Sequence, residues 1–373
     1  MWLDDFQIQH IEVPFKDPIK VGNEIIEQKK SLYLTLNFSN KKSGSGEISL
    51  LPGLIDLSPK EAIEEVNLFL LPLLKKRIEG IDKPIKESDL KTLFFNKLPR
   101  PNYKIASPVI FAIESALLSW NKETFQNNFE DLFPGTKDDF TIPVNDLLYP
   151  NEEKLDLEAS SFKIKIGRFN QNKSKNEEIS FIKKVAEKLK VLHPNNSKRI
   201  RLDGNRSFSL SSLQSYIDLI DVDTLAQIEY LEEPLKDINQ WELFYKKNGI
   251  GLGLDESIFD LEDHKITLPV GTKALILKPS VIGGISKYFF YLIWGKERGI
   301  KVVVSSTFES SLGLFTLSLI ASKEGKTPSG LSTHRYLDEK VPYYLFKTAN
   351  GRMLVQKPSN DRSEAKEDSR HPL

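Results

Sequence analysis

Five short apolar runs between residues 163 and 278 each carry a charged residue near the C-terminal end, and this series constrains the fold most strongly. Each gap between these charged residues fits one strand–loop–helix–loop unit, which needs about 30 residues. Successive units place the C-terminal ends of parallel strands around one mouth, where the catalytic residues of a (β/α)8 barrel lie. The spacing therefore predicts that three carboxylates and two or three lysines converge on one point. They are Lys163, Lys165, Asp203, Glu232, Asp255 and Lys278.

The length of the chain suits a barrel with a second, smaller domain. The chain has 373 residues, whereas a barrel takes about 200–250. Apolar and polar residues alternate at 6–15, 30–37 and 47–50, which predicts a small antiparallel sheet. Two helices should follow, one opened by a capping box at Ser58 and Glu61 and one opened at Ser107 with the same cap chemistry. The N-terminal part is therefore predicted to be an α+β domain.

Strands and helices alternate in the rest of the chain, which predicts a parallel α/β sheet. We expect residues 141–145 to form the first barrel strand. Residues 340–356 should form two strands about a turn at Asn350 and Gly351, and these should return to the N-terminal sheet. The predicted domains are 1–125 with 338–357, then 126–337, then a disordered tail at 358–373; the predicted barrel helices lie at 175–192, 210–220, 237–247, 284–298 and 311–322.

Composition excludes several classes of function. Lysine and arginine number 52, as do aspartate and glutamate, so the chain lacks the basic excess of a nucleic-acid or membrane-surface binder. The absence of cysteine excludes disulfides, thiolate metal sites and cysteine nucleophiles, and the five histidines show no metal-ligand spacing. We see no signal peptide, and the longest apolar run, 288–294, is far shorter than the ~20 residues that span a bilayer. We expect a cytoplasmic protein that acts on a small-molecule carboxylate, without an obligate protein partner.

Three of the converging residues suit a metal. Asp203, Glu232 and Asp255 would offer only oxygen ligands, with positions left open for water or substrate, and such a site suits Mg²⁺. Each acid alone is more often a surface residue paired with a lysine. Three acids at matched strand ends favour the metal site.

The lysines suit proton transfer. Lys163 and Lys165 are two residues apart, so they share one strand face, and Lys278 should face them across the metal. Clustered cations together with Mg²⁺ should depress a lysine pKa and make that lysine a general base. The assembly suits removal of a proton next to a carboxylate, with Mg²⁺ opposing the charge that develops.

Two further segments are weaker candidates. The glycines at 249–253 resemble a dinucleotide-binding loop, but they follow a helix and precede a strand, the reverse of that motif, so a turn is the better interpretation. Residues 305–313 follow a strand and precede a helix. They could be an ordinary link, or they could offer N–H groups and hydroxyls to a second carboxylate.

At these residues the chain resembles the o-succinylbenzoate synthases, of the muconate-lactonizing branch of the enolase superfamily. The resemblance extends from about residue 15 to about residue 337 and implies a (β/α)7β TIM-like barrel with an N-terminal α+β capping domain. It also implies Mg²⁺ and a step of menaquinone biosynthesis, the syn dehydration of 2-succinyl-6-hydroxy-2,4-cyclohexadiene-1-carboxylate through an enediolate. The motifs that carry it are Lys163-x-Lys165, Leu202-Asp203-Gly204-Asn205, Tyr230-Leu231-Glu232-Glu233-Pro234, Asp255-Glu256-Ser257, Lys278-Pro279 and the segment 305–313.

The resemblance also implies roles for individual residues. Lys165 would remove the α-proton and return it to the leaving hydroxide, and Lys278 would stabilise the enediolate. Lys163 would contact the substrate carboxylate, supported by Arg201 and Asn205. Residues 51–54 resemble the capping-domain loop that closes over the site. The residues near the succinyl group would be Ser306, Ser310 and Ser311.

Two alternatives stay open. An N-acylamino acid racemase or a dipeptide epimerase would use the same scaffold and both facing lysines. A dipeptide epimerase should carry an acidic pair near the last strands, where residues 305–311 offer only Glu309. A barrel that binds a ligand without catalysis is the other class, and the complete set of lysines and acids argues against it. One departure from the family is that Lys29 and Lys30 stand where it often has an arginine.

Overall fold

The computed structural model describes residues 1–21, 24–93, 98, 103–148, 159–167, 174–193, 199–258, 267–340 and 342–356. The predicted tail at 358–373 lies outside this part of the chain. In the described part, no helix has both the length and the apolar character needed to cross a membrane.

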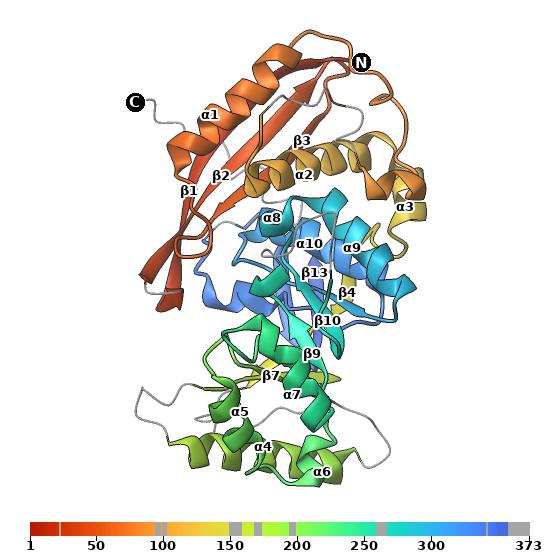
Figure 1. Cartoon of the computed structure of the whole chain (residues 1–373). Helices are drawn as coiled ribbons and strands as arrows, with labels where there is room; N and C mark the ends of the chain where they lie inside the picture. The colour runs from red at the N-terminus through yellow and green to blue at the C-terminus, as the bar shows by residue number, and fades with distance from the viewer. Residues whose placement is uncertain are drawn as a thin grey trace.

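The N-terminal part folds as an antiparallel sheet in the order β1-β2-β3, formed by β1 (Leu3–Val21), β2 (Glu24–Phe38) and β3 (Ser43–Leu50). Helices α1 and α2 run along one side of this sheet (Figure 1). Two glycines let α2 approach β3, because a Cβ on Gly44 would lie 1.9 Å from Ala116 O and one on Gly46 would lie 2.1 Å from Ala112 O. The helices here are α1 (Pro59–Leu70), α2 (Ser107–Thr124) and α3 (Gln126–Leu132), with 3₁₀ helices at Leu71–Leu73 and Glu87–Lys91.

Of the two predicted helix caps, the structure contains one. Ser58 caps α1 as expected, because its hydroxyl accepts from Glu61 N and its own N–H donates to the Glu61 carboxylate. The prediction for α2 is wrong. Ser107 is already the first helical residue, and the cap residue Ala106 has no side chain that could accept a hydrogen bond. The Ser107–Pro108 pair resembles the Ser58–Pro59 pair at the start of α1, but it lies one residue further into its helix.

The second part is built on a seven-stranded parallel sheet in the order β11-β10-β9-β8-β7-β6-β5. It carries the helices at 175–192, 237–247, 284–298 and 311–322 close to their predicted places. The strands are β5 (Asp146–Leu148), β6 (Ser161–Lys165), β7 (Arg199–Asp203), β8 (Ile228–Glu232), β9 (Leu252–Leu254), β10 (Thr272–Leu277) and β11 (Lys301–Val304). The helices are α4 (Lys175–Leu192), α5 (Leu210–Ile217), α6 (Val222–Leu225), α7 (Trp241–Asn248), α8 (Pro279–Ile282), α9 (Ile285–Glu297) and α10 (Ser311–Glu324), with 3₁₀ helices at Ile238–Gln240, Glu256–Ile258 and Ser332–Tyr336.

Two residues close the sheet into a barrel. Ser329 forms a parallel bridge with Val144, just before β5, and Gly330 forms one with Ser305, just after β11. The backbone N–H of Gly330 also donates to Val304 O at 2.9 Å. These isolated bridges join the two edges of the sheet, in agreement with the (β/α)7β architecture that the resemblance implied.

Two expectations about the ends of the second part are wrong. Of the predicted first barrel strand, 141–145, Val144 and Asn145 contact the barrel edge at Ser329, but β4 (Phe140–Pro143) pairs antiparallel with β13 (Arg352–Gln356), and β5 is the strand that pairs with β6. The hairpin of β12 (Leu345–Ala349) and β13 forms about Asn350 and Gly351 as predicted, but it pairs with β4 and not with the N-terminal sheet. Both segments therefore belong to one separate three-stranded sheet.

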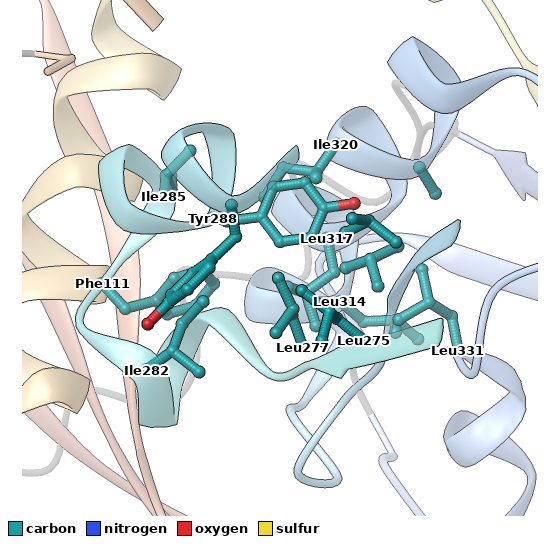
Figure 2. Packing of buried hydrophobic residues seen from close by; sticks show 14 of the residues in the cluster. Phe111, Leu275, Leu277, Ile282, Ile285, Tyr288, Leu314, Leu317, Ile320 and Leu331 are labelled. Carbon is teal, nitrogen blue, oxygen red and sulfur yellow. The ribbon is translucent and has the colours of Figure 1, made fainter. Parts of the chain in front are cut away.

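A continuous apolar core joins the two parts. Figure 2 shows Phe111 of α2 lying beside Ile282 and Ile285 at α8 and α9. Next to this contact, the buried carboxylate of Glu114 on α2 accepts hydrogen bonds from the N–H groups of Ile285 and Ser286 and from the Ser286 hydroxyl. The N-terminal domain thus supplies the acceptor for the start of a barrel helix, whose first N–H groups lack partners within the helix.

Glu114 makes the stability of this contact depend on pH. Burial raises the pKa of Glu114 to about 7, although the hydrogen bonds from Ser286 and Ile285 oppose this shift. Between about pH 4.5 and 7 the folded state therefore binds more protons than the unfolded chain, so the free energy of unfolding falls as the pH rises. We expect the wild type to lose up to about 3 kcal/mol more than Glu114→Gln across this window. Urea denaturation of both proteins at pH 5 and 7.5 checks this, and equal losses would contradict it.

Candidate active site

The predicted lysines and acids lie at the C-terminal ends of consecutive barrel strands. On β6 and β7, Lys165 is in register with Asp203, which is in register with Glu232 of β8. Asp255 directly follows β9, and Lys278 directly follows β10. Because the strands are parallel and adjacent, these side chains share one edge of the sheet.

These side chains line one cavity of about 920 Å³. Strand ends of the barrel form its base. The N-terminal domain contributes residues 18–21 of β1 and Leu51, Gly53 and Leu54 of the loop after β3. Of the residues predicted from the sequence, the cavity is lined by Lys163, Lys165, Arg201, Asp203, Asn205, Glu232, Asp255, Lys278 and Ser306.

An ammonium group lies between two of the predicted metal ligands. Lys163 Nζ is 2.9 Å from Asp203 Oδ2 and 2.7 Å from Glu232 Oε1, and Lys278 Nζ is paired with Asp255. Over the described residues, no group of three or more Asp, Glu, His or Cys side chains is arranged to hold a metal ion. The three carboxylates therefore share a cavity, but lysines neutralise them in this structure.

The lysines and acids strongly affect one another. Burial alone would lower the pKa of Lys163, but the charges of Asp203 and Glu232 raise it well above its ordinary value. The pKa of Lys278 is also raised, because the charge of Asp255 outweighs the effect of burial. The prediction of a lowered lysine pKa concerned the base in the presence of Mg²⁺, and it stays a prediction. Burial raises the pKa of Glu232 to about 8, helped by the charges of Asp203 and Asp255 and opposed by Lys163.

Arg201 lies deeper in the barrel than Asp203 and is almost fully buried. Its Nε donates to Glu229 Oε2 at 2.8 Å and its Nη1 donates to Pro328 O at 3.0 Å. Its guanidinium carbon lies 5.3 Å from the centre of the Tyr230 ring. Arg201 Nη2 and the Tyr230 hydroxyl are buried and have no hydrogen-bond partner among the described residues. Arg201 therefore carries a buried guanidinium nitrogen that is unpaired among the described residues, next to the cavity that this arginine lines.

The three predicted serines after β11 lie in two different environments. Ser306 lines the cavity, and its hydroxyl lies 2.6 Å from Thr333 Oγ1. Ser310 and Ser311 are buried outside the cavity, so the prediction that they lie near a substrate is corrected. The Ser310 hydroxyl donates to Glu47 and the Ser311 hydroxyl donates to Glu339, each at 2.7 Å. Sequence proximity placed all three together, but the start of α10 turns the last two toward the N-terminal sheet and the residues that follow the barrel.

Glu233 is a site residue that our sequence reasoning missed. It is fully buried beside Glu232, and its backbone adopts a positive φ of 43°. Its carboxylate accepts from the N–H groups of Asp255 and Ser257, at 2.8 and 2.7 Å, and from Arg206 Nε at 2.8 Å. Glu233 therefore fixes the backbone that carries Asp255. The doubled acid before Pro234 was visible in the sequence, but its role depends on a contact with the next strand.

The N-terminal domain covers the mouth of the cavity through a small apolar cluster. Phe308 of the barrel packs edge-on against Phe15 of β1, with ring centres 5.3 Å apart, and against Tyr336 at 6.0 Å. Leu51 and Leu337 are buried in the same cluster. The 51–54 loop thus lies at the cavity, where the sequence placed it.

Comparisons with known proteins agree with the motifs. No family model matches the chain. The o-succinylbenzoate synthase of Salmonella dublin is 25% identical over 317 residues, covering 85% of this chain and 86% of that protein. A solved enolase-superfamily member from Listeria innocua has a TM-score of 0.71 at 21% identity, covering 96% of this chain and 93% of that one. The dipeptide epimerase of Methylococcus capsulatus, solved with Mg and a dipeptide, has a TM-score of 0.68 at 17% identity, covering 96% and 98%.

These likenesses confirm that the chain is similar to o-succinylbenzoate synthases, and they confirm the predicted fold class, a (β/α)7β barrel with a capping domain. They also support the expectation that the chain is an enzyme. They leave the individual site residues as predictions, which the cavity geometry now constrains.

Proposed function

We propose that this chain, which has the enolase-superfamily fold, is an o-succinylbenzoate synthase. It would eliminate water from 2-succinyl-6-hydroxy-2,4-cyclohexadiene-1-carboxylate to form o-succinylbenzoate. One observation carries the proposal: lysines and carboxylates from the ends of five consecutive strands line a single cavity. The curated relative supports the choice of this reaction within the superfamily.

The donor set fits Mg²⁺, which we propose as the cofactor. The Lys163 ammonium group already lies between Asp203 and Glu232, so a cation fits between these carboxylates. Burial raises the pKa of Glu232 and the charges of Asp203 and Asp255 add to this shift, so a bound cation would favour the ionised carboxylates. When bound by Asp203, Glu232 and Asp255, Mg²⁺ would oppose the negative charge that develops on the substrate carboxylate. A related fold solved with Mg supports this cofactor.

The lysines would divide the work. The raised pKa values of Lys163 and Lys278, set by the carboxylates against the effect of burial, keep both protonated at neutral pH. This suits Lys163 for binding the substrate carboxylate and Lys278 for stabilising the enediolate of the substrate. Lys165 would be the base. It would take the proton from the carbon that bears the carboxylate and give it to the departing hydroxide on the same face, so that one water leaves.

Other lining residues of the cavity suit the second carboxylate of the proposed substrate. Ser306 and Thr333 offer hydroxyls there, and Lys20 and Arg335 contribute positive charge. Lys20 comes from the capping domain and Arg335 follows the last barrel strand. A dianionic substrate would therefore meet positive charge beyond that of the lysines on the barrel strands.

The alternative is an N-acylamino acid racemase or a dipeptide epimerase, which would use Lys165 and Lys278 for proton transfer on both faces. The cavity argues against a peptide amine. Glu309 is fully buried with hydrogen-bond partners of its own, and it does not line the cavity. Along the described stretches 303–308 and 330–336, the lining residues include no carboxylate. An N-acylated amino acid needs no such group and is the stronger alternative.

Turnover of the cyclohexadiene substrate tests the proposal. We expect loss of diene absorbance in the ultraviolet with Mg²⁺ and loss of this activity with EDTA, restored by added Mg²⁺. A folded, Mg²⁺-loaded protein without turnover would contradict the proposal. Exchange of the α-proton of N-acylamino acids or dipeptides in D₂O would then identify a racemase or an epimerase.

A further inference from the structure

A fully buried group of charges lies between the N-terminal sheet and the barrel. It consists of Lys29 on β2, Glu47 on β3 and Glu309 after β11, which we call the interdomain ion cluster. Lys29 is 1% exposed, and the two glutamates are 0% exposed. Charges at such depth are costly unless each has close partners. The partners of these three residues connect the N-terminal domain to the wall of the active-site cavity.

Glu47 binds the start of helix α10. One oxygen accepts from Ser31 Oγ at 2.6 Å and from Ser310 N at 3.1 Å, and the other accepts from Ser310 Oγ at 2.7 Å and from Gly313 N at 3.0 Å. A helix N-terminus presents unpaired N–H groups and positive potential, which a carboxylate complements. A Cβ on Gly313 would lie 2.6 Å from Glu47 Oε2, so glycine at this position leaves room for the contact.

Glu309 shapes the segment just before this helix. Its carboxylate accepts from Thr307 N at 2.6 Å and from Thr307 Oγ1 at 2.7 Å, and also from Ser280 Oγ at 2.7 Å. These bonds span Phe308, whose φ of 58° is unfavourable for a bulky residue. Thr307 and Phe308 line the cavity together with Ser306. Glu309 therefore holds part of the cavity wall in a conformation that it would not adopt alone.

Lys29 reaches the cavity wall through one hydroxyl. Its ammonium group donates to Ser49 Oγ at 2.7 Å, and Ser49 Oγ lies 3.0 Å from Thr307 Oγ1. One hydroxyl thus separates a buried lysine of the capping domain from a residue of the cavity wall. The single positive charge of Lys29 acts on Glu47 and Glu309, so removal of either partner changes the balance at the other.

We propose that Glu47 and Lys29 are positioning residues, through which the capping domain fixes the cavity wall at residues 305–310 and so sets the affinity for the substrate. Neither residue lines the cavity, and the lysines and acids of the site lie on other strands. Loss of the interdomain ion cluster should therefore weaken substrate binding more than it slows chemistry.

The first test does not depend on the identity of the substrate. Hydrogen exchange of the full chain should show the amides of Ser310 and Gly313 exchanging at least about tenfold faster in Glu47→Gln than in the wild type. Gly313→Ala, which changes no charge, should have a similar effect because its Cβ displaces Glu47. Glu27→Gln, an exposed change on β2 two residues from Lys29, should leave exchange unchanged. Wild-type protection in Glu47→Gln would overturn the proposal, whatever reaction the enzyme catalyses.

The second test rests on the proposed function. With the cyclohexadiene substrate, Glu47→Gln should raise KM at least about fivefold while kcat stays within about twofold, because uniform binding is lost. Lys29→Met should raise KM further, since it leaves two buried carboxylates without their cation, and adding Glu47→Gln to it should lower KM again. Equal KM values for Glu47→Gln and the wild type, with a lower kcat, would indicate a purely structural role. Should the wild type not turn over this substrate, the proposed function fails and the exchange experiment alone decides.

Discussion

Replacing Lys165 with alanine is expected to lower kcat by about 10²–10⁴-fold, the range that general acid–base catalysis contributes. The effect should lie near the upper end, because this lysine would both remove the α-proton and return it to the departing hydroxide. Lys165 lines the cavity and is in register with Asp203, so the change removes the base and leaves the strand pairing in place. Steady-state turnover with saturating Mg²⁺ measures the loss.

A matched control separates catalysis from folding. Lys188 on α4 is exposed and remote from the cavity, so Lys188→Ala should retain full activity. The Lys165→Ala protein should keep the wild-type circular dichroism spectrum and should still bind o-succinylbenzoate. A Lys165→Ala enzyme with more than about a tenth of wild-type kcat would remove Lys165 from the role of base.

The sequence predicted those features of the site that depend on chain order alone. Parallel strands joined by helices must present their C-terminal ends together, so Asp203, Glu232 and Asp255 could be assigned to one mouth before any contact was known. The capping box at Ser58 was equally local, since both partners lie within one helical turn. For this reason the fold class and the cavity base were predictable.

The features that the sequence missed depend on contacts between distant segments. Nothing near residue 350 shows that its hairpin pairs with β4 and not with the N-terminal sheet. Ser306 lines the cavity, whereas Ser310 donates to Glu47, a residue far away in the chain. Nothing in the neighbouring sequence separates the two serines. The pairing of Lys163 and Lys278 with the acids assigned to the metal also depends on contacts between different strands.

Glu233 provides the strongest test of how the site is held. Glu233→Ala is expected to reduce the free energy of unfolding by about 2–4 kcal/mol, because it removes a fully buried carboxylate that accepts from partly exposed Arg206. It also leaves the N–H groups of Asp255 and Ser257 without their acceptor. Urea denaturation gives the loss. Glu242→Ala, which removes an exposed partner of Lys246, should cost less than about 1 kcal/mol.

The same substitution should weaken metal binding independently of stability. Asp255 keeps its own carboxylate in the Glu233→Ala protein, but the backbone that orients it is no longer fixed. Loss of groups that orient metal ligands typically costs about 10–100-fold in affinity or activity. We therefore expect the Mg²⁺ concentration for half-maximal activity to rise by at least about tenfold in protein that is still folded. Glu233→Gln keeps an acceptor for the two N–H groups but places an NH₂ group where Arg206 Nε and the Ser257 hydroxyl donate, so it should recover most of the Mg²⁺ affinity but less of the stability. If both variants bind Mg²⁺ like the wild type, Glu233 stabilises the fold without orienting Asp255.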